Sequence, residues 1–461
     1  MMINHNSKEA EKCPKIFRKM ARLARKLQSD LCAKLIGFTS DIVNSENFLD
    51  KHRKNPKDFI RNRSLPFPIL INFLSNMNKG SIQDELDHYF KALNNADVAE
   101  RVVSNSALTK ARKKVKHEAF IDLNEHINHY FYDIFPHQTW RGFNLLAVDG
   151  STAALLSLLE NAEHFGQWNP TNGDPRPVAR ISQMFDVLNR ITIDAIISPK
   201  SNGERELAAQ HFLKLMPNDL ILLDRGYPAF WLFKLIVSMG ADFCARISYD
   251  VWKVVKKFFN SGKKGKTIEL KCSYKSGKEC RKMGLDTKPM KLRLVRIELD
   301  TGEAEILITS LTEKEAYPND IFDELYHLRW PVEEDYKVMK LRLEVENWSG
   351  KTVHSVYQDF HAKVFAKNLT AMLAHPTRPI IKEQYAHRKY LYQLNFTQAL
   401  SKTKDTIVLL FNRTSDAVRE IIAKLHDIFI KTVEPVRPDR KYPRNHKIRR
   451  KPFYPNYKPA R

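Results

Sequence analysis

The N-terminal part of the chain has the hydrophobic spacing of helices. Apolar side chains recur every three or four residues over 14–36, with Lys and Arg between them, which is the pattern of an amphipathic helix. Similar spacing predicts helices over 69–77, 81–93 and 106–120. The last of these carries the basic residues Lys110, Arg112, Lys113, Lys114 and Lys116. A basic helix after short helices fits a helix-turn-helix-like DNA-binding unit, and it fits a solvated basic face equally well.

From residue 143 the pattern changes to strands alternating with helices. Short apolar runs predict strands over 143–148, 184–188, 191–197, 220–223 and 241–247. Asn189-Arg190 is the predicted hairpin turn between the second and third of these strands. Helical spacing predicts helices over 204–216 and 228–239, between the last three strands. Strands and helices in this order predict a mixed α/β sheet.

Residues 251–303 interrupt that pattern with a basic segment. It holds 15 Lys and Arg against 6 Asp and Glu, and the alternation over 291–299 predicts a strand within it. We interpret this segment as a basic β insertion, about 249–308, ending in a strand at 304–309. Further helices are expected over 323–343, 357–373 and most of 391–433. The tail from residue 434 holds 10 Lys and Arg against 2 acids, with six Pro, and is expected to be extended.

Charge narrows the choice of partners. The 461 residues carry a formal net charge of +23, from 76 Lys and Arg against 53 Asp and Glu. A surplus of this size favours a polyanion, and nucleic acid is the first class to consider. The chain has no apolar run of about 18 residues, so no membrane span is expected, and its basic N-terminus lacks the apolar segment of a secretory signal. Five widely spaced cysteines favour a reducing cytoplasm over a disulfide framework or a zinc site.

Two aspartates share one sequence context. Asp149 and Asp224 each directly follow a short apolar strand and precede a small residue or a turn. In an open α/β sheet, side chains at the carboxyl ends of strands converge on one crevice. Two carboxylates there can bind hard divalent cations through oxygen, although an Asp at a strand end is also a common turn former. These two positions alone leave both interpretations open.

A third carboxylate lies in YHLRWPVEEDYKVMK, residues 326–340. At about 100° per residue on a helix, one face would carry Tyr326, Arg329, Glu333, Lys337 and Lys340. One carboxylate among three cations and a phenol suits a metal ligand beside a phosphate clamp, whereas a surface helix with i,i+4 ion pairs is the competing interpretation. Pro331 lies inside the segment, so the helix is expected to begin near Trp330, after a turn or bend.

These motifs together resemble those of a known family. Tyr-x2-Arg-x3-Glu-x6-Lys, filled by Tyr326, Arg329, Glu333 and Lys340, resembles the signature of DDE transposases of bacterial insertion sequences, in the insertion-sequence-four group. AVDGST and LLDRGY resemble the two aspartate motifs of that family, in the same order, and a basic insertion precedes the glutamate helix as it does there. SALTKARKKV and RPDRKYPR resemble its N-terminal and C-terminal segments, so matching pieces run from about residue 60 to about residue 450.

The resemblance implies an α/β fold with a ribonuclease-H-like catalytic core. Asp149, Asp224 and Glu333 would be the DDE triad and would bind two Mg²⁺ or Mn²⁺ ions for in-line phosphoryl displacement. The implied activity is cut-and-paste DNA transposition. A water first cuts the strand at the transposon end, and the 3′-OH that is freed then attacks either the opposite strand, which forms a hairpin, or the target DNA.

The resemblance also assigns DNA contacts. Tyr326, Arg329 and Lys340 would hold phosphates of the transposon end, because Arg offers a bidentate fork and Lys a point charge. Trp330 would stack on the displaced base. Lys337 is a further candidate phosphate contact. Trp252 in the insertion could serve the same base, although such a Trp is more often packed.

The predicted domains are a helical N-terminal DNA-binding region (1–135), the catalytic core with its insertion (136–375), a helical C-terminal region (376–433) and the basic tail (434–461). The expected partners are double-stranded DNA, namely transposon terminal inverted repeats and target, and a second copy of the chain. The helices of 391–433 are the candidate contact of that synaptic homodimer. The expected location is the nucleoid of a bacterial cytoplasm.

Two other functions are alternatives. One is a metal-dependent nuclease of the same fold that cannot perform strand transfer. The other is a catalytically silent or domesticated sequence-specific DNA-binding protein. The complete set of three carboxylates argues against a silent protein, which has no need to keep all three.

Overall fold

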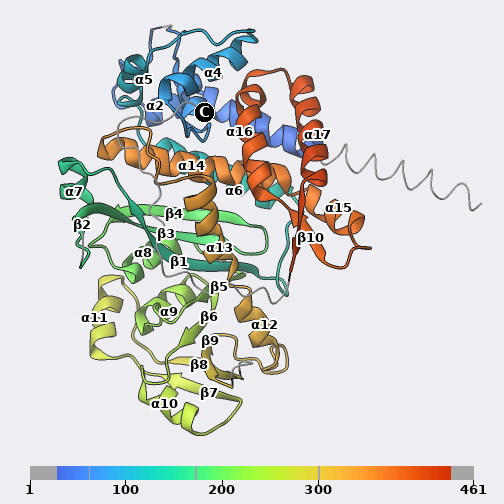
Figure 1. Ribbon diagram of the computed structural model, residues 1–461. Coiled ribbons are helices and arrows are strands. Elements are labelled where there is room, and N and C mark those ends of the chain that lie inside the picture. Colours follow the sequence, from blue (N-terminus) through green and yellow to red (C-terminus); the bar gives the residue numbers. More distant parts are fainter. Residues whose placement is uncertain (1–28, 62, 172–173, 299–301, 438–461) are drawn as a thin grey trace, which may run out of the picture. The chain divides into compact units, whose positions relative to one another are not determined.

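The computed structural model describes residues 29–437, with gaps at 62, 172–173 and 299–301 (Figure 1). The chain divides into two compact units. One combines the N-terminal segment up to Pro136 with the C-terminal segment from His354, and the other comprises His137–Val353. Most of the basic tail, and residues 14–28 of the helix expected over 14–36, lie outside the described residues. No helix in the described part of the chain is long and apolar enough to cross a membrane.

The first unit is helical, as the apolar spacing predicts. Its helices are 29–44, α2 (Glu46–His52), α3 (Phe67–Leu74), α4 (Ile82–Asn94), α5 (Asn105–Arg112), α6 (Glu118–Ile134), α14 (Val353–Ala374), α15 (Thr377–Gln384), α16 (Phe396–Asn412) and α17 (Ser415–Lys431). Two short strands, β10 (Leu391–Leu394) and β11 (Val433–Val436), pair antiparallel. The chain around residue 434 is therefore a strand, where we expected the extended tail to begin.

The basic helix expected over 106–120 is split and only partly solvated. A turn separates α5 from α6. The exposed basic residues of the segment 106–120 are Lys110, Lys113 and Lys114. Arg112 is only 5% exposed, and its guanidinium donates to Asp359 at 2.9 Å and to Gln358 at 3.0 Å, both on α14. The expectation that Arg112 contacts DNA is therefore wrong, because a buried arginine that is paired with a carboxylate is held inside its own unit.

The second unit is built on a nine-stranded mixed sheet. Its strands are β1 (Asn144–Ala154), β2 (Gln167–Trp168), β3 (Arg176–Asp186), β4 (Ile191–Pro199), β5 (Asp219–Leu223), β6 (Asp242–Ile247), β7 (Gly265–Leu270), β8 (Met290–Glu298) and β9 (Ala304–Thr309). β1, β5 and β6 are parallel neighbours, and β3 and β4 continue antiparallel beyond β1. Beyond β6 the sheet continues antiparallel through β9, β8 and β7. The mixed α/β sheet predicted from the sequence is confirmed.

The helices of this unit are α7 (Leu159–Phe165), α8 (Glu204–Phe212), α9 (Phe230–Ser238), α10 (Lys253–Asn260), α11 (Tyr274–Lys282), α12 (Ile321–His327) and α13 (Pro331–Lys337). A π-helical turn, η1 (Val338–Arg342), follows α13 directly. The basic insertion is therefore not purely β, because α10 and α11 lie in it beside β7 and β8. Its strands extend the central sheet rather than forming a separate one.

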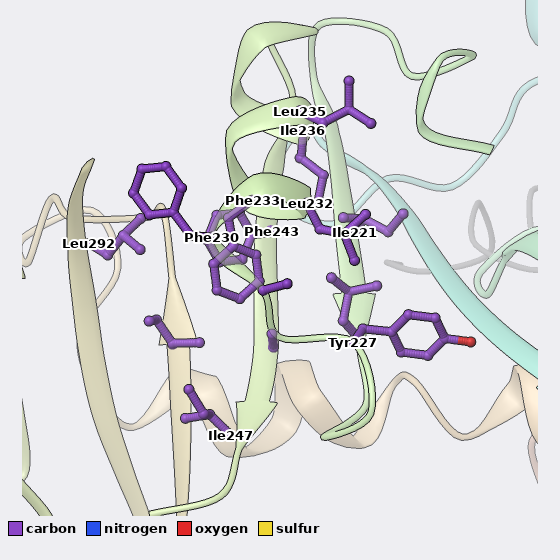
Figure 2. Close-up of a cluster of buried hydrophobic side chains, with 14 of the residues drawn as sticks. Ile221, Tyr227, Phe230, Leu232, Phe233, Leu235, Ile236, Phe243, Ile247 and Leu292 are labelled. Carbon is purple, nitrogen blue, oxygen red and sulfur yellow. The ribbon is translucent and has the colours of Figure 1, made fainter. Parts of the chain in front are cut away.

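Apolar side chains cover both faces of the parallel strands. On one face, Leu146, Val148, Ile221 and Leu223 pack with residues of α8 and α9. Figure 2 shows Ile221 in this cluster with Phe233 of α9. On the other face, Leu145, Ala147, Leu220 and Leu222 pack with residues of α12 and α13. Burial on both sides explains why β5 has the continuous apolar sequence typical of parallel strands, without polar alternation.

A stacked aromatic pair anchors α9 to the sheet. The rings of Phe233 and Phe243 lie 4.1 Å apart at an interplanar angle of 11°, and both side chains are fully buried. We predict that Phe243→Ala lowers the free energy of unfolding by about 3–5 kcal/mol, because it leaves a cavity that the sheet cannot close. Val237→Ala, at a 42% exposed site on the same helix, should cost less than about 0.5 kcal/mol. Guanidinium denaturation measures both, and equal losses would contradict this account of the core.

Candidate active site

The pairing of β1 with β5 brings two aspartates together. The parallel register runs to Val148 opposite Leu223, and the next residue on each chain is Asp149 or Asp224. Neighbouring strands lie about 4.8 Å apart, and residues in register point to the same face. Side chains alternate along a strand, so both carboxylates point to the face that α12 and α13 cover.

Only one of these aspartates ends its strand. Asp224 follows β5 directly, whereas β1 continues past Asp149 to Ala154 through its pairing with β3. Our expectation that Asp149 ends a strand is therefore wrong. The two carboxylates still lie side by side, because each aspartate directly follows the last pair of the β1–β5 register, Val148 opposite Leu223.

Glu333 approaches the same place from the first turn of α13. It acts electrostatically on Asp149, as does Asp224, so the three predicted carboxylates share one site. The pKa of Asp149 is raised to about 6, mainly by burial and to a smaller degree by the negative charges of Glu333 and Asp224, while Arg329 acts in the opposite direction. The protonated form of Asp149 is therefore favoured chiefly because its carboxyl is buried.

A cation and a phenol from the junction of α12 and α13 border these carboxylates. The Arg329 guanidinium donates to Glu333 Oε1 at 2.5 Å and lies 5.8 Å from the centre of the Tyr326 ring. The Tyr326 hydroxyl donates to Asp224 Oδ1 at 3.4 Å. Arg329 is 9% exposed, and its Nε is buried without a hydrogen-bond partner among the described residues.

The helix break predicted at Pro331 is confirmed, and a second irregularity follows it. α13 begins at Pro331, with Trp330 as its N-cap. Proline has no backbone N–H, and at the first position of a helix this costs no helical hydrogen bond. Lys340 lies in η1, so its direction does not follow the regular 3.6-residue period. The single straight face expected over 326–340 is therefore wrong, although Tyr326, Arg329 and Glu333 still meet.

Trp330 and Lys337 form an exposed pair beside this site. The Trp330 side chain is 54% exposed, and its Nε1 donates to Glu334 at 3.1 Å. Lys337 donates to the same carboxylate at 2.6 Å and lies 5.8 Å from the indole. Trp252, in contrast, is partly buried and packs edge-on against Phe233 with ring centres 6.2 Å apart, which favours the packing interpretation of that residue.

The sequence motifs missed two hydroxyl groups at Asp149. The hydroxyl of Tyr336, a buried side chain on α13, donates to the backbone oxygen of Asp149 at 2.7 Å. Ser182 Oγ lies 3.5 Å from the same oxygen. Tyr336 comes three residues after Glu333, so helical spacing alone put it near the site, but nothing in the sequence showed what its hydroxyl contacts.

Ser182 also belongs to a buried polar network behind Asp149. His211 lies 3.0 Å from Ser182 Oγ through Nε2 and 2.7 Å from Asp194 through Nδ1, and Lys214 donates to Asp194 at 2.9 Å. The order of groups resembles a serine hydrolase triad. Ser182 is only 2% exposed and His211 is fully buried, so no substrate reaches them and the network is structural.

The donor set suits a divalent cation. Carboxylate oxygens are the ligands that Mg²⁺ and Mn²⁺ prefer, and the pKa of Asp149 is raised by burial and by the neighbouring carboxylates of Glu333 and Asp224. Among the described residues, no three His, Cys, Asp or Glu side chains are arranged to hold a metal ion as they stand. The Glu333 carboxylate is instead paired with Arg329, so a cation would have to replace that partner.

Comparisons with known proteins agree on the class of this chain. Residues 140–369 match the family model described as "Transposase DDE domain", and domains of this class carry out phosphoryl transfer on DNA. The transposase InsG for insertion sequence element IS4 of Escherichia coli (strain K12) is 23% identical over 345 residues, covering 74% of this chain and 76% of that protein. The chain therefore carries the DDE domain of transposases over residues 140–369 and is a distant homologue of an insertion-sequence transposase.

A solved structure is also similar, at a lower sequence identity. The piggyBac transposase synaptic complex with hairpin DNA is 10% identical, with a TM-score of 0.41, over 86% of this chain and 85% of that chain.

The pKa of Asp149 makes a prediction about stability. The folded protein holds this proton more tightly than the usual value of 3.8, so stability falls as pH rises from about 4 to about 6 and stays lower above that range. Without metal, Asp149→Asn should therefore be more stable than the parent protein at about pH 8, by roughly 2 kcal/mol. Denaturation in EDTA should show this gain shrinking towards about pH 4. Asp250→Asn, at an exposed site, is the control, and a gain that does not change with pH would contradict the prediction.

Proposed function

We propose that this chain is a cut-and-paste DNA transposase in which Asp149, Asp224 and Glu333 form the catalytic triad. The observation that carries the proposal is the β1–β5 register, with two adjacent aspartates on the face from which the glutamate approaches. The strand order β4-β3-β1-β5-β6, in which β3 alone runs antiparallel to the other four, supports a ribonuclease-H-like core.

The triad carboxylates would hold two Mg²⁺ or Mn²⁺ ions, which supply activation of the attacking oxygen and stabilisation of the leaving one. The residues of the chain would bind the ions and orient the reacting DNA. Asp149 is close to half protonated near pH 6 and has to lose that proton to act as a ligand. Glu333 has to leave Arg329, and that exchange frees the guanidinium for another anion.

The anion proposed for Arg329 is a phosphate of the transposon end. The buried Nε of this residue has no partner among the described residues, and a phosphate oxygen can accept from it in the bidentate geometry that Arg favours. Tyr326 adjoins the same guanidinium, and Lys340 and Lys337 follow on the same segment. The exposed ring of Trp330 is available to stack on a displaced base.

Other parts of the proposal extend beyond this site. Lys110, Lys113 and Lys114 remain candidate DNA contacts of the region 1–135, and the region 376–433 remains the candidate dimer contact. The domain boundaries predicted from the sequence, the hairpin intermediate and action on nucleoid DNA stay predictions.

Strand cleavage and joining test the proposed triad. Purified protein, Mg²⁺ and a labelled duplex carrying the element's terminal inverted repeat should give nicked ends with free 3′-OH groups, which then join a second DNA. Asp149→Ala and Glu333→Gln should each lower the rate at least ~100-fold, because each removes a proposed ligand. Glu324→Gln, at an exposed site on α12, should cleave normally.

Each other outcome of that assay has a meaning. Nicking without joining would identify a nuclease, and metal-independent DNA binding without cleavage would identify a silent DNA-binding protein. Unchanged activity after either triad substitution would refute the assignment of those residues.

The proposed phosphate contact predicts a change in salt dependence. Arg329→Gln should weaken binding to end DNA and reduce the slope of log K against log salt by about 1, because one phosphate contact is lost. Fluorescence anisotropy between low and moderate salt measures the slope. Arg190→Gln, at an exposed turn between β3 and β4, removes the same charge as a control. Equal slopes for Arg329→Gln and the parent protein would exclude the contact.

A further inference from the structure

Tyr336 connects the glutamate helix to the strand of the first aspartate. Its hydroxyl donates to the backbone oxygen of Asp149 at 2.7 Å. Tyr336 lies on α13, and Asp149 lies on β1. The hydroxyl therefore ties the glutamate helix to the backbone of β1 at the position of a predicted metal ligand.

The same helix carries Glu333 one turn earlier. Helical residues three apart lie on neighbouring positions of one face, so a fixed Tyr336 hydroxyl also fixes where Glu333 stands. α13 also packs in the apolar cluster on this face of the sheet, through Val332. Apolar contacts are not directional, whereas a hydrogen bond of this length constrains both distance and angle.

We infer that Tyr336 is a positioning residue, which holds Asp149 and Glu333 at the separation that a shared divalent cation requires. The inference rests on the proposed function, because it takes both residues as ligands. Metal sites tolerate errors of only about 0.5 Å in ligand placement, and neighbours that orient ligands typically contribute 10- to 100-fold to affinity or activity.

The surroundings of this hydroxyl favour a structural role. Burial raises the pKa of Tyr336 well above its ordinary value, with Asp149, Tyr227 and Asp335 adding to the effect. The hydroxyl therefore stays protonated at neutral pH, where it donates to a carbonyl and does not take up a proton. Ser182 contacts the same carbonyl from 3.5 Å, which is too long to replace the 2.7 Å bond.

The chain offers a matched control in Tyr227. This tyrosine is also buried, and Asp149 and Asp224 act on it electrostatically. Its hydroxyl, however, has no hydrogen-bond partner among the described residues. Tyr227→Phe and Tyr336→Phe therefore remove the same atom from similar surroundings, and only the second removes a bond to the aspartate strand.

Manganese titration of the full chain tests the inference apart from catalysis. Electron paramagnetic resonance of free Mn²⁺ gives the Kd, which should be about tenfold weaker in Tyr336→Phe and unchanged in Tyr227→Phe. Binding to end DNA in EDTA should be unaffected by either substitution. Cleavage by Tyr336→Phe should need more Mn²⁺ and approach the parent rate at saturation.

The outcomes separate this inference from the function on which it rests. One outcome is that Asp149→Ala loses Mn²⁺ binding while Tyr336→Phe binds Mn²⁺ as tightly as the parent protein. The positioning role is then overturned, and the proposed triad survives. If Asp149→Ala binds Mn²⁺ as tightly as the parent protein, the triad assignment fails and the positioning role fails with it.

A crystal structure of the unmodified protein with Mn²⁺ keeps the inference testable if Tyr336→Phe does not fold. The inference predicts that the Tyr336 hydroxyl stays within about 3 Å of the Asp149 backbone oxygen while Asp149 and Glu333 bind the ion. A separation of more than about 3.5 Å with the ion bound would overturn the positioning role.

Discussion

The structure of the α/β unit depends on the parallel pairing of a long strand with a shorter one. β5 stops at Leu223, while β1 continues beyond Val148, so Asp149 and Asp224 lie side by side where the ladder ends. Two carboxylates this close repel each other, and burial adds a desolvation cost. The apolar clusters on both faces of the sheet supply the burial that outweighs this cost, and Arg329 offsets part of the charge. The fold therefore holds these carboxylates together although they repel each other, as expected where a cation is to bind.

Local patterns in the sequence predicted most of the elements but not their full extent. The mixed sheet, the β3–β4 hairpin and the break at Pro331 all follow from apolar periodicity and proline geometry. The extension of β1 through Gly150 to Ala154 does not, because those residues are held as a strand by pairing with β3 and have little strand propensity of their own. α10 and α11 were missed for a related reason. They lie in a lysine-rich segment whose few apolar residues pack into the cluster shared with α9.

The candidate site could be predicted from the sequence only for residues whose type and spacing form a motif. The three carboxylates, Tyr326 and Arg329 belong to a motif and meet in space. Arg112 looked like part of a basic face, and its burial depends on Asp359, which is 247 residues away. Tyr336 was overlooked because its partner is a backbone oxygen 187 residues away, and backbone acceptors leave no trace in the sequence. Roles that are set by tertiary contacts, rather than by local pattern, were beyond the reach of the sequence.

The central claim is that these three carboxylates form one cation site on the sheet. Anomalous diffraction at the manganese edge, from crystals of the protein grown with Mn²⁺ and end DNA, tests it most directly. The account predicts manganese peaks that are ligated by Asp149, Asp224 and Glu333, with the Glu333 carboxylate turned away from Arg329. Manganese bound elsewhere, or a Glu333–Arg329 pair that persists with metal and DNA present, would contradict it.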